Sequence, residues 1–202
     1  MALHTSRNLP FRSFKRAACG LLLGLASVAA QAEPVDYQID IEGAHAFVNF
    51  KFKHLGYSWL TGTFKDFDGK FVWDPEDVAN SKIEVVLQTA SLDSNHAERD
   101  KHIRDKRYLN VSEFPEASFV STRIAQLDDG MLEVTGDLTL HGVTKEITFP
   151  AEIIGEGPDP WGGYRAGFAG EYVLDTTEFG MENFRPLNKI WLELLVEGKR
   201  KS

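Results

Sequence analysis

Two histidines and a carboxylate lie close together in the segment His96-Ala-Glu-Arg-Asp-Lys-His102, and such side chains bind metals or transfer protons. On a helix His96 and Asp100 share a face because they are four residues apart, whereas His102 falls on another side. Three ligands therefore do not converge, and the sequence predicts no metal site and no catalytic residue. The alternative is an enzyme that acts on an isoprenoid or another small molecule near His96, Asp100 and His102.

The same segment carries a charge that is unusual for this chain. From His96 to Arg107 there are five basic and three acidic residues, a net charge of +2. Residues 1–32 hold four of the 22 basic residues and none of the 30 acidic ones, so residues 33–202 carry 18 basic against 30 acidic residues, formally −12. So acidic a domain argues against nucleic acid and anionic membranes as general partners. Five residues of the island are candidates for contacting a ligand head group: His96, Arg99, Asp100, His102 and Arg104.

The first 32 residues have the pattern of a secretory signal peptide. Four basic residues precede an apolar segment at 17–30, and Ala30-Gln-Ala32 is a small-x-small cleavage site. We expect cleavage after Ala32, export to the periplasm and a single domain over residues 33–202. The apolar segment is shorter than the roughly 20 residues that span a bilayer, and the mature protein has no transmembrane segment. Cys19, the only cysteine, lies in this segment, which excludes disulfides and cysteine-ligated metals from the domain.

The elements that must position the charged segment are mostly strands. Apolar residues alternate with polar ones along much of the domain, as in Leu132-Glu-Val-Thr135. This pattern predicts eight or nine antiparallel strands, near residues 35–41, 45–54, 61–73, 82–89, 117–122, 131–140, 143–154, 164–174 and 189–198. Turn residues separate them at Asp128-Asp-Gly130, His141-Gly142, Gly155-Glu-Gly157 and Pro158–Gly163.

The charged segment is the only predicted helix, over residues 94–109, with Asp93 or Ser94 as its N-cap. It has no apolar stripe, so we expect it to lie over another element or in solvent. Its charges suggest local pairs, Glu98 with His102 and Asp100 with Arg104.

One-sided antiparallel strands in this number form either two packed sheets or a closed barrel, and periodicity alone does not choose between them. Their apolar faces are rich in aromatic side chains. These are bulky for a narrow sandwich core but suit the lining of a barrel of about eight strands around one ligand.

Several motifs, in order along nearly the whole domain, resemble those of the YceI-like family of bacterial periplasmic proteins. The segments that carry the resemblance are Tyr37–Asp40, His45–Phe50, His54–Trp59, Gly62–Gly69, Asn95–His102, Phe114-Pro115, Gly136–Leu140, Gly142–Lys145 and Asp159–Gly163. The segment Phe179–Lys189 departs from the family pattern, because it contains Phe184, Arg185 and Leu187 where small residues are expected.

The resemblance implies an extended lipocalin-like antiparallel β-barrel with one short charged helix, whose lumen holds a polyisoprenoid or an isoprenoid quinone as its only bound group. It also implies homodimers, a role in lipid binding, transport, storage or stress, and no established catalytic activity. A third reading is a stress-related protein that interacts through its acidic exterior. From the apolar strand faces we predict the lumen lining to be Phe50, Phe52, Phe71, Val85, Leu138, Leu140, Ile147, Phe149, Phe168, Tyr172, Leu192 and Leu194.

Overall fold

The computed structural model of this protein describes residues 34–185 and 188–201, together with Met1. The signal peptide and the cleavage site predicted within residues 1–32 lie outside these ranges, apart from Met1. None of the helices in the described ranges is both long enough and apolar enough to cross a membrane.

The described chain is built from strand segments, one α-helix and four short 3₁₀ helices. The strands are β1 (Val35–Ile39), β2 (Phe47–His54), β3 (Ser58–Phe64), β4 (Phe67–Trp73), β5 (Lys82–Gln88), β6 (Leu92–Asp93), β7 (Glu116–Gln126), β8 (Leu132–Leu140), β9 (Val143–Pro158), β10 (Tyr164–Asp175) and β11 (Lys189–Arg200). The helices are η1 (Val78–Asn80), η2 (Thr89–Ser91), α1 (Ala97–Arg104), η3 (Thr176–Phe179) and η4 (Glu182–Phe184).

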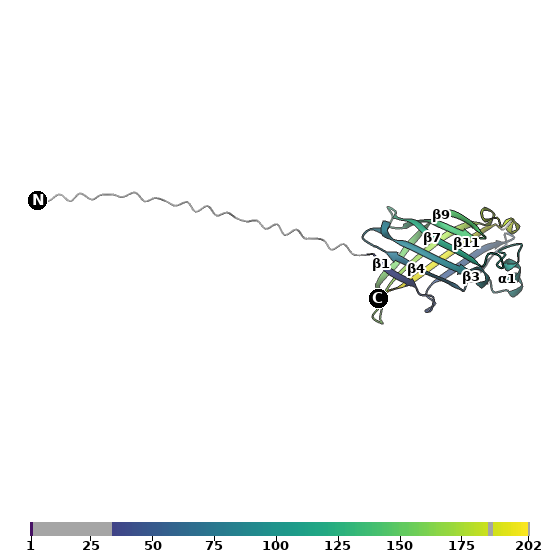
Figure 1. The fold of residues 1–202 in the computed structure, drawn as a ribbon, viewed down its shortest axis with the longest axis horizontal. Helices are drawn as coiled ribbons and strands as arrows, with labels where there is room; N and C mark the ends of the chain where they lie inside the picture. Colours follow the sequence, from purple (N-terminus) through teal and green to yellow (C-terminus); the bar gives the residue numbers. More distant parts are fainter. Residues whose placement is uncertain (2–33, 186–187, 202) are drawn as a thin grey trace. The chain divides into compact units, whose positions relative to one another are not determined.

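These segments form an eight-stranded antiparallel barrel within the described residues (Figure 1). The ring runs β1, β4, β5, β7, β8, β9, β10 and β11, and β11 pairs back with β1. Three of the eight strands are interrupted. β1 continues as β2, β3 continues as β4 and β5 continues as β6, each after a short segment that leaves the sheet. The pairing of β11 with β1 closes the ring, so the barrel predicted from the aromatic strand faces is confirmed.

The wall is weakest where α1 follows β6. This strand pairs with β3 through only two residues, Leu92 and Asp93, and no strand pairs with its other side in the part of the chain that the structure describes. Figure 1 places α1 at this end of the barrel. The charged helix therefore lies beside an open part of the wall.

Three predicted strand boundaries were wrong because pairing with neighbours overrides local sequence. The strand predicted at 61–73 is β3 and β4, interrupted at residues 65–66, and the one predicted at 117–122 continues to Gln126. The predicted turn at Gly155-Glu-Gly157 lies within β9, because these residues pair with Arg165, Ala166 and Gly167 of β10.

The hairpin at His141-Gly142 is confirmed. Leu140 pairs directly with Val143, and the two residues between them have positive φ angles of 52° and 74°. Such a two-residue turn matches the twist of the strands that it joins.

Apolar side chains from every strand of the ring point into the barrel, and close approach of one aromatic ring depends on a glycine. Phe50 of β2 is 6% exposed and pairs with Gly62 of β3. A Cβ atom on Gly62 would collide with the Phe50 ring and would lie 2.7 Å from the carbonyl oxygen of Asp93. Gly62 therefore makes room for Phe50 inside the lumen.

Replacement of Gly62 by alanine should lower the free energy of unfolding by about 2 kcal/mol, because a methyl group forces Phe50 from its position. Urea unfolding followed by circular dichroism measures this loss. Gly155→Ala in β9 is the matched control, since no atom lies within 4 Å of the added Cβ. Equal stability of the two variants would contradict the packing role of Gly62.

Candidate functional site

Two adjoining cavities occupy the barrel lumen. An inner cavity of about 170 Å³ lies away from α1, and an outer cavity of about 370 Å³ lies toward it. Both are lined mostly by carbon atoms of inward-facing strand residues. Five side chains line both cavities and mark their junction: Val48, Leu87, Ala117, Leu138 and Leu192.

Aromatic rings fill the lumen beyond the inner cavity. Tyr37 stacks on Phe71 with ring centres 4.8 Å apart, and Phe168 meets the edges of Phe71 and Trp73 at 5.4 and 5.0 Å. Tyr37 and Trp73 are 1% and 4% exposed. Trp73 Nε1 donates a hydrogen bond of 2.8 Å to Glu156, which satisfies its one polar atom. This end of the lumen is therefore packed.

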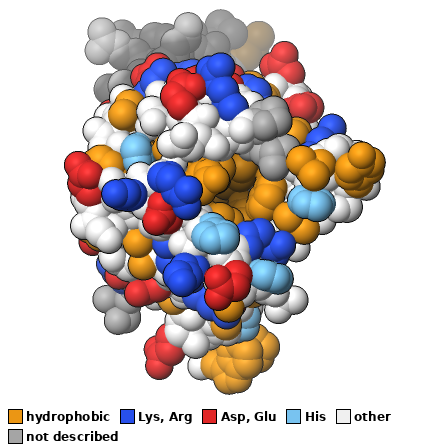
Figure 2. All heavy atoms as spheres, turned by 90° about the vertical axis from the view of Figure 1, so that its right-hand side faces the viewer, with side chains coloured by type: hydrophobic (Ala, Val, Ile, Leu, Met, Phe, Trp, Pro, Cys, Tyr) orange, Lys and Arg blue, Asp and Glu red, His pale blue; other side chains and the backbone are white. Residues whose placement is uncertain are grey.

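The outer cavity opens at the α1 end. Figure 2 shows a hollow with hydrophobic side chains inside it and with basic and histidine side chains around its rim. Its outermost lining comes from Arg99, His102 and Ile103 of α1 and from Asn183, Phe184 and Arg185 after β10. Tyr108 and Phe184 meet edge to face at this end, with ring centres 5.0 Å apart.

All twelve residues predicted to line the lumen contact these cavities. Nine line the inner cavity: Phe71, Val85, Leu138, Ile147, Phe149, Phe168, Tyr172, Leu192 and Leu194. Phe50, Phe52 and Leu140 line the outer one. Alternation found them because inward residues of a strand recur at every second position. Their role in holding a ligand stays a prediction.

The five predicted head-group residues do not lie together. Arg99 and His102 line the outer cavity, whereas His96, Asp100 and Arg104 line a shallow hollow on the outer surface of α1. The separation follows from the helix, since positions 96, 100 and 104 share one face. The enzyme alternative requires His96, Asp100 and His102 to line one cavity, and they do not.

The helix itself is shorter than predicted. It spans Ala97–Arg104 instead of 94–109, and its N-cap is His96, not Asp93 or Ser94. His96 Nδ1 accepts a hydrogen bond from Arg99 N at 3.2 Å. Asp105 is the C-cap that ends the helix, and its backbone is extended with φ −61° and ψ 156°.

Neither of the local charge pairs predicted within α1 forms in the described part of the chain, and Arg99, Asp100 and Arg104 bind the preceding segment instead. Asp100 is 6% exposed and accepts hydrogen bonds from Ser94 N, at 3.0 Å, and from Ser94 Oγ. Arg99 donates to Ser94 Oγ and to the Ser94 carbonyl oxygen at 2.8 and 2.5 Å. Arg104 donates to the carbonyl oxygens of Ala90, at 2.8 Å, and of Leu92.

The segment that departs from the family pattern, Phe179–Lys189, packs inward over its described part. Phe179 and Met181 are 0% and 2% exposed, and Phe184 lines the outer cavity. Asp175 holds the base of this segment by accepting hydrogen bonds of 2.8 Å from Lys189 and Asn188. These bonds, that from Lys189 above all, hold the pKa of Asp175 well below its usual range. Alternation missed these lining residues because they lie outside strands.

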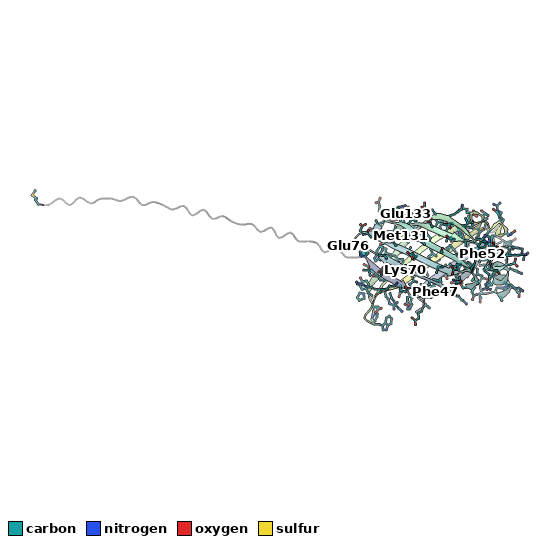
Figure 3. All side chains as sticks on the ribbon, in the orientation of Figure 1. Phe47, Phe52, Lys70, Glu76, Met131 and Glu133 are labelled. Atoms are coloured by element: carbon teal, nitrogen blue, oxygen red, sulfur yellow. The ribbon has the colours of Figure 1, made fainter. Side chains whose placement is uncertain are left out.

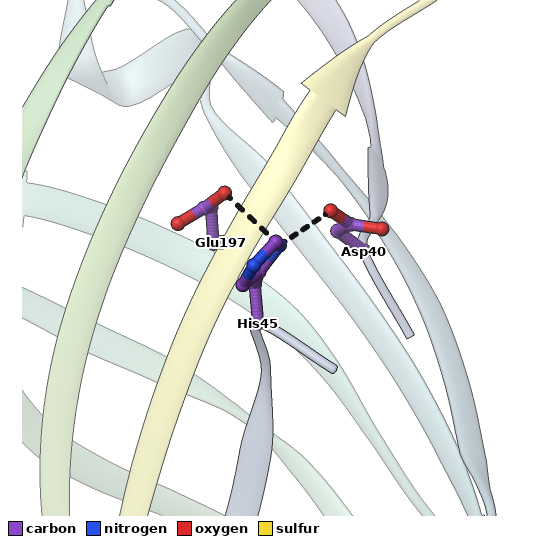
Figure 4. Close-up of side chains that lie close together, drawn as sticks. All are labelled: Asp40, His45 and Glu197. Atoms are coloured by element: carbon purple, nitrogen blue, oxygen red, sulfur yellow. Dashed lines mark hydrogen bonds and ion pairs between the residues drawn. The ribbon is translucent and has the colours of Figure 1, made fainter. Parts of the chain in front are cut away.

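A second polar cluster lies at the break between β1 and β2, where Asp40, His45 and Glu197 come together (Figure 4). Asp40 is 3% exposed. Its carboxylate accepts hydrogen bonds of 2.8 Å from His45, Arg165 and Lys199 and one of 2.9 Å from Gly43 N. Since two cationic side chains already occupy these oxygens, the cluster is an ion-pair network, and we assign no metal to it.

This network shifts the pKa values of Asp40 and Arg165. Burial by itself would raise the pKa of Asp40, but hydrogen bonds from Lys199, His45 and Arg165 outweigh it and hold that pKa well below its usual range. The Asp40 carboxylate likewise raises the pKa of Arg165, which also contacts Asp159 and Glu197. Arg165 thus joins β10 to β11 and to the β1–β2 break.

The loop that contains Trp161 is held by the same network. Asp159 accepts hydrogen bonds from Trp161 N and Gly163 N at 3.0 and 2.7 Å and pairs with Arg165 at 3.0 Å. The Trp161 ring is 78% exposed, with the Arg165 guanidinium 5.4 Å from its centre. Asp159 therefore anchors this loop.

Comparison with known proteins agrees with this architecture. Residues 37–197 match the YceI-like domain family. A "UPF0312 protein" of Ectopseudomonas mendocina is 53% identical over 188 residues, which cover 92% of this chain and 98% of that protein.

Two solved structures share the fold. The crystal structure of the Campylobacter jejuni YCEI protein aligns with a TM-score of 0.66 and 27% identity, over 74% of this chain and 90% of that one. A polyisoprenoid binding domain from Saccharophagus degradans aligns with a TM-score of 0.61 over 83% of this chain and 99% of that one. At 14% identity this second likeness shows the fold alone.

The Asp40 network predicts a pH-dependent loss of stability. Asp40→Asn should lower the free energy of unfolding by about 2 kcal/mol at neutral pH, because charge-assisted hydrogen bonds are lost from a buried site. Because the folded-state pKa of Asp40 is lowered, its contribution is complete above the unfolded value of about 3.9 and declines as the pH falls below it. The difference between wild type and variant should therefore shrink below about pH 4.

Urea unfolding at a series of pH values measures this difference. Asp128→Asn, in an exposed turn, is the control, and it should change stability by less than about 0.5 kcal/mol at any pH. A constant difference between wild type and Asp40→Asn down to the lowest pH would contradict the assignment.

Proposed function

Since this chain belongs to the YceI-like family, we propose that it is a non-enzymatic binding protein that holds the prenyl chain of a polyisoprenoid or isoprenoid-quinone lipid in its lumen. The observation that carries this proposal is the pair of adjoining apolar cavities, which run from the aromatic end to the opening beside α1. The name of the Saccharophagus degradans domain, which describes polyisoprenoid binding, supports the choice of ligand class.

The lumen suits a long hydrocarbon better than a polar metabolite. Among the residues that line the inner cavity, only Ser81, Lys82, Ser118, Tyr172 and Trp73 carry polar side-chain atoms, and Trp73 Nε1 already donates to Glu156. Burial of each methylene group contributes about 0.8 kcal/mol before ordering costs, so a prenyl chain binds without exacting polar contacts. A hydrophilic ligand would lose its hydration and find few hydrogen-bond partners.

The head group then lies at the opening of the outer cavity. His102 is exposed there, and Asn183 and Arg185 line the same rim. Arg104 is a poorer candidate, because its guanidinium group donates to the Ala90 and Leu92 carbonyl oxygens. A diphosphate and a quinone both accept hydrogen bonds, so this rim is compatible with either head group.

Binding, not catalysis, fits the histidines of α1. His96 Nδ1 accepts from the backbone at the helix N-terminus, and Asp100 is buried against Ser94. Both side chains have structural partners outside the cavity that His102 lines. We place this binding function in the periplasm, because residues 1–32 have the pattern of a cleavable secretory signal.

Protein purified from the fraction released by osmotic shock should have the intact mass of residues 33–202, because we expect cleavage after Ala32.

Organic extraction of that protein should release a prenyl lipid, detected by mass spectrometry, because the cavities are apolar along their length. Recovery of no prenyl species, together with no binding of added prenyl quinone, would refute the proposed ligand class.

The junction of the two cavities should control chain length. Ala117 is 4% exposed and lines both cavities, so Ala117→Leu should block the inner one. Affinity for a long prenyl quinone should fall at least about tenfold, as expected when two or more buried methylene groups are expelled, while affinity for a short-chain analogue changes little. Fluorescence titration with a chain-length series measures both affinities.

Ala125→Leu is the matched control, because it makes the same change on the same strand away from both cavities. Circular dichroism establishes that both variants are folded. If Ala117→Leu binds long and short chains as wild type does, the prenyl chain does not pass this junction.

A further inference from the structure

The outer face of β2, β3 and β11 carries an exposed aromatic and cationic cluster that the lumen does not use. Trp59 and Trp191 meet edge to face with ring centres 4.8 Å apart. The ammonium groups of Lys51 and Lys53 each lie 5.6 Å from the centre of the Trp59 ring. Trp59 is 46% exposed, and within the described residues neither lysine forms an ion pair. We call these four residues the Trp–Lys patch.

The tip of the β2–β3 hairpin continues this patch with apolar side chains in solvent. Leu55 and Tyr57 are 63% and 88% exposed. Leu55 and Gly56 have positive φ angles of 53° and 83°, and Tyr57 N donates to the His54 carbonyl oxygen at 2.9 Å. This tight turn holds both side chains at the end of the hairpin.

The hairpin tip lies at the end of the barrel where the outer cavity opens. Phe50 and Phe52 of the same strand line the outer cavity, whereas Phe47 lines the inner one. Figure 3 shows Phe52 nearer than Phe47 to the end that carries α1 in Figure 1. Strand β2 therefore runs toward the opening, and its tip lies beside it.

The charge of this hairpin is opposite to that of the domain. Residues 50–65 contain Lys51, Lys53 and Lys65 and no aspartate or glutamate, although residues 33–202 carry 30 acidic residues. Lys65 pairs with Asp93, whereas the two lysines of the Trp–Lys patch have no ion pair within residues 34–185 and 188–201. Carboxylates border the patch, since Glu193 accepts a hydrogen bond from Asn49 and lines a surface hollow with Lys51 and Trp191, so the cationic part of this surface is the β2–β3 hairpin itself.

We propose that the β2–β3 hairpin is a docking surface for a bilayer that contains anionic phospholipid. Tryptophan and tyrosine rings favour the level of lipid head groups, lysine ammonium groups attract lipid phosphates, and exposed Leu55 and Tyr57 enter the acyl boundary. The acidic remainder of the domain is repelled, so the protein docks with this end toward the lipid. The surface adds a partner to the proposed function and does not depend on what the lumen holds.

The test uses residues 33–202, the domain expected after cleavage, which contain the whole barrel and exclude the apolar segment at 17–30. Flotation with phosphatidylcholine vesicles that contain phosphatidylglycerol should carry the protein upward, and vesicles of phosphatidylcholine alone should carry far less. Leu55→Asn with Tyr57→Ser should weaken binding to the anionic vesicles about tenfold, and Lys51→Gln with Lys53→Gln roughly twentyfold. Asparagine tolerates the positive φ at position 55.

Ile154→Asn with Trp161→Ser is the matched control, because it removes two apolar side chains, 64% and 78% exposed, from β9 and the β9–β10 loop. This pair should bind vesicles as wild type does. The proposal is overturned if the hairpin variants float as wild type does, if the control loses as much binding, or if wild type binds both kinds of vesicle equally or neither. Lipid extraction that recovers no prenyl species refutes the lumen ligand alone, so the two proposals fail separately.

Discussion

Closure of the barrel depends on a short pairing between its first and last strands. Only Tyr37, Gln38 and Ile39 of β1 pair with β11, because the chain leaves the ladder at Asp40 and resumes it as β2. Asp40 N still donates to the Glu197 carbonyl oxygen at 2.8 Å, and its carboxylate binds Arg165 and Lys199 across the seam. The buried Asp40 carboxylate, which accepts four hydrogen bonds, thus stabilises the seam where the ring closes. The closed ring in turn encloses the lumen.

The basic island that distinguishes the sequence has a structural reason. No strand pairs with the outer side of β6 in the described residues, so backbone carbonyl groups of this segment need other hydrogen-bond donors. Arg104 satisfies those of Ala90 and Leu92, and Arg99 satisfies that of Ser94. These guanidinium groups replace the donors that a continued strand would supply. The two arginines therefore stabilise the barrel wall, and His102 is left at the rim.

Much of the barrel could be predicted because alternation is a local property. Residues such as Leu138 and Leu192 face inward wherever a strand of this kind is closed, so the sequence pattern located the lining before any contact was known. The breaks could not be predicted in this way. Asp40 meets Arg165 across 125 residues, and no periodicity reports such a contact. The sequence pattern likewise does not predict the rim residues Tyr108 and Phe184, because each is positioned by packing between segments that are distant in the chain.

Aromatic rings pack one end of the lumen, and the larger outer cavity opens at the other end, so the two ends are unlike. If the lumen holds a prenyl chain, as we propose, the chain enters tail first at the outer cavity, and each methylene group drawn back into water costs about 0.8 kcal/mol. Residence time should accordingly grow geometrically with tail length, about fourfold for each methylene group, while the rate of entry changes little. The lumen would then sort lipids by residence time. Short-tailed lipids exchange rapidly, and long-tailed ones stay bound until another apolar surface contacts the opening.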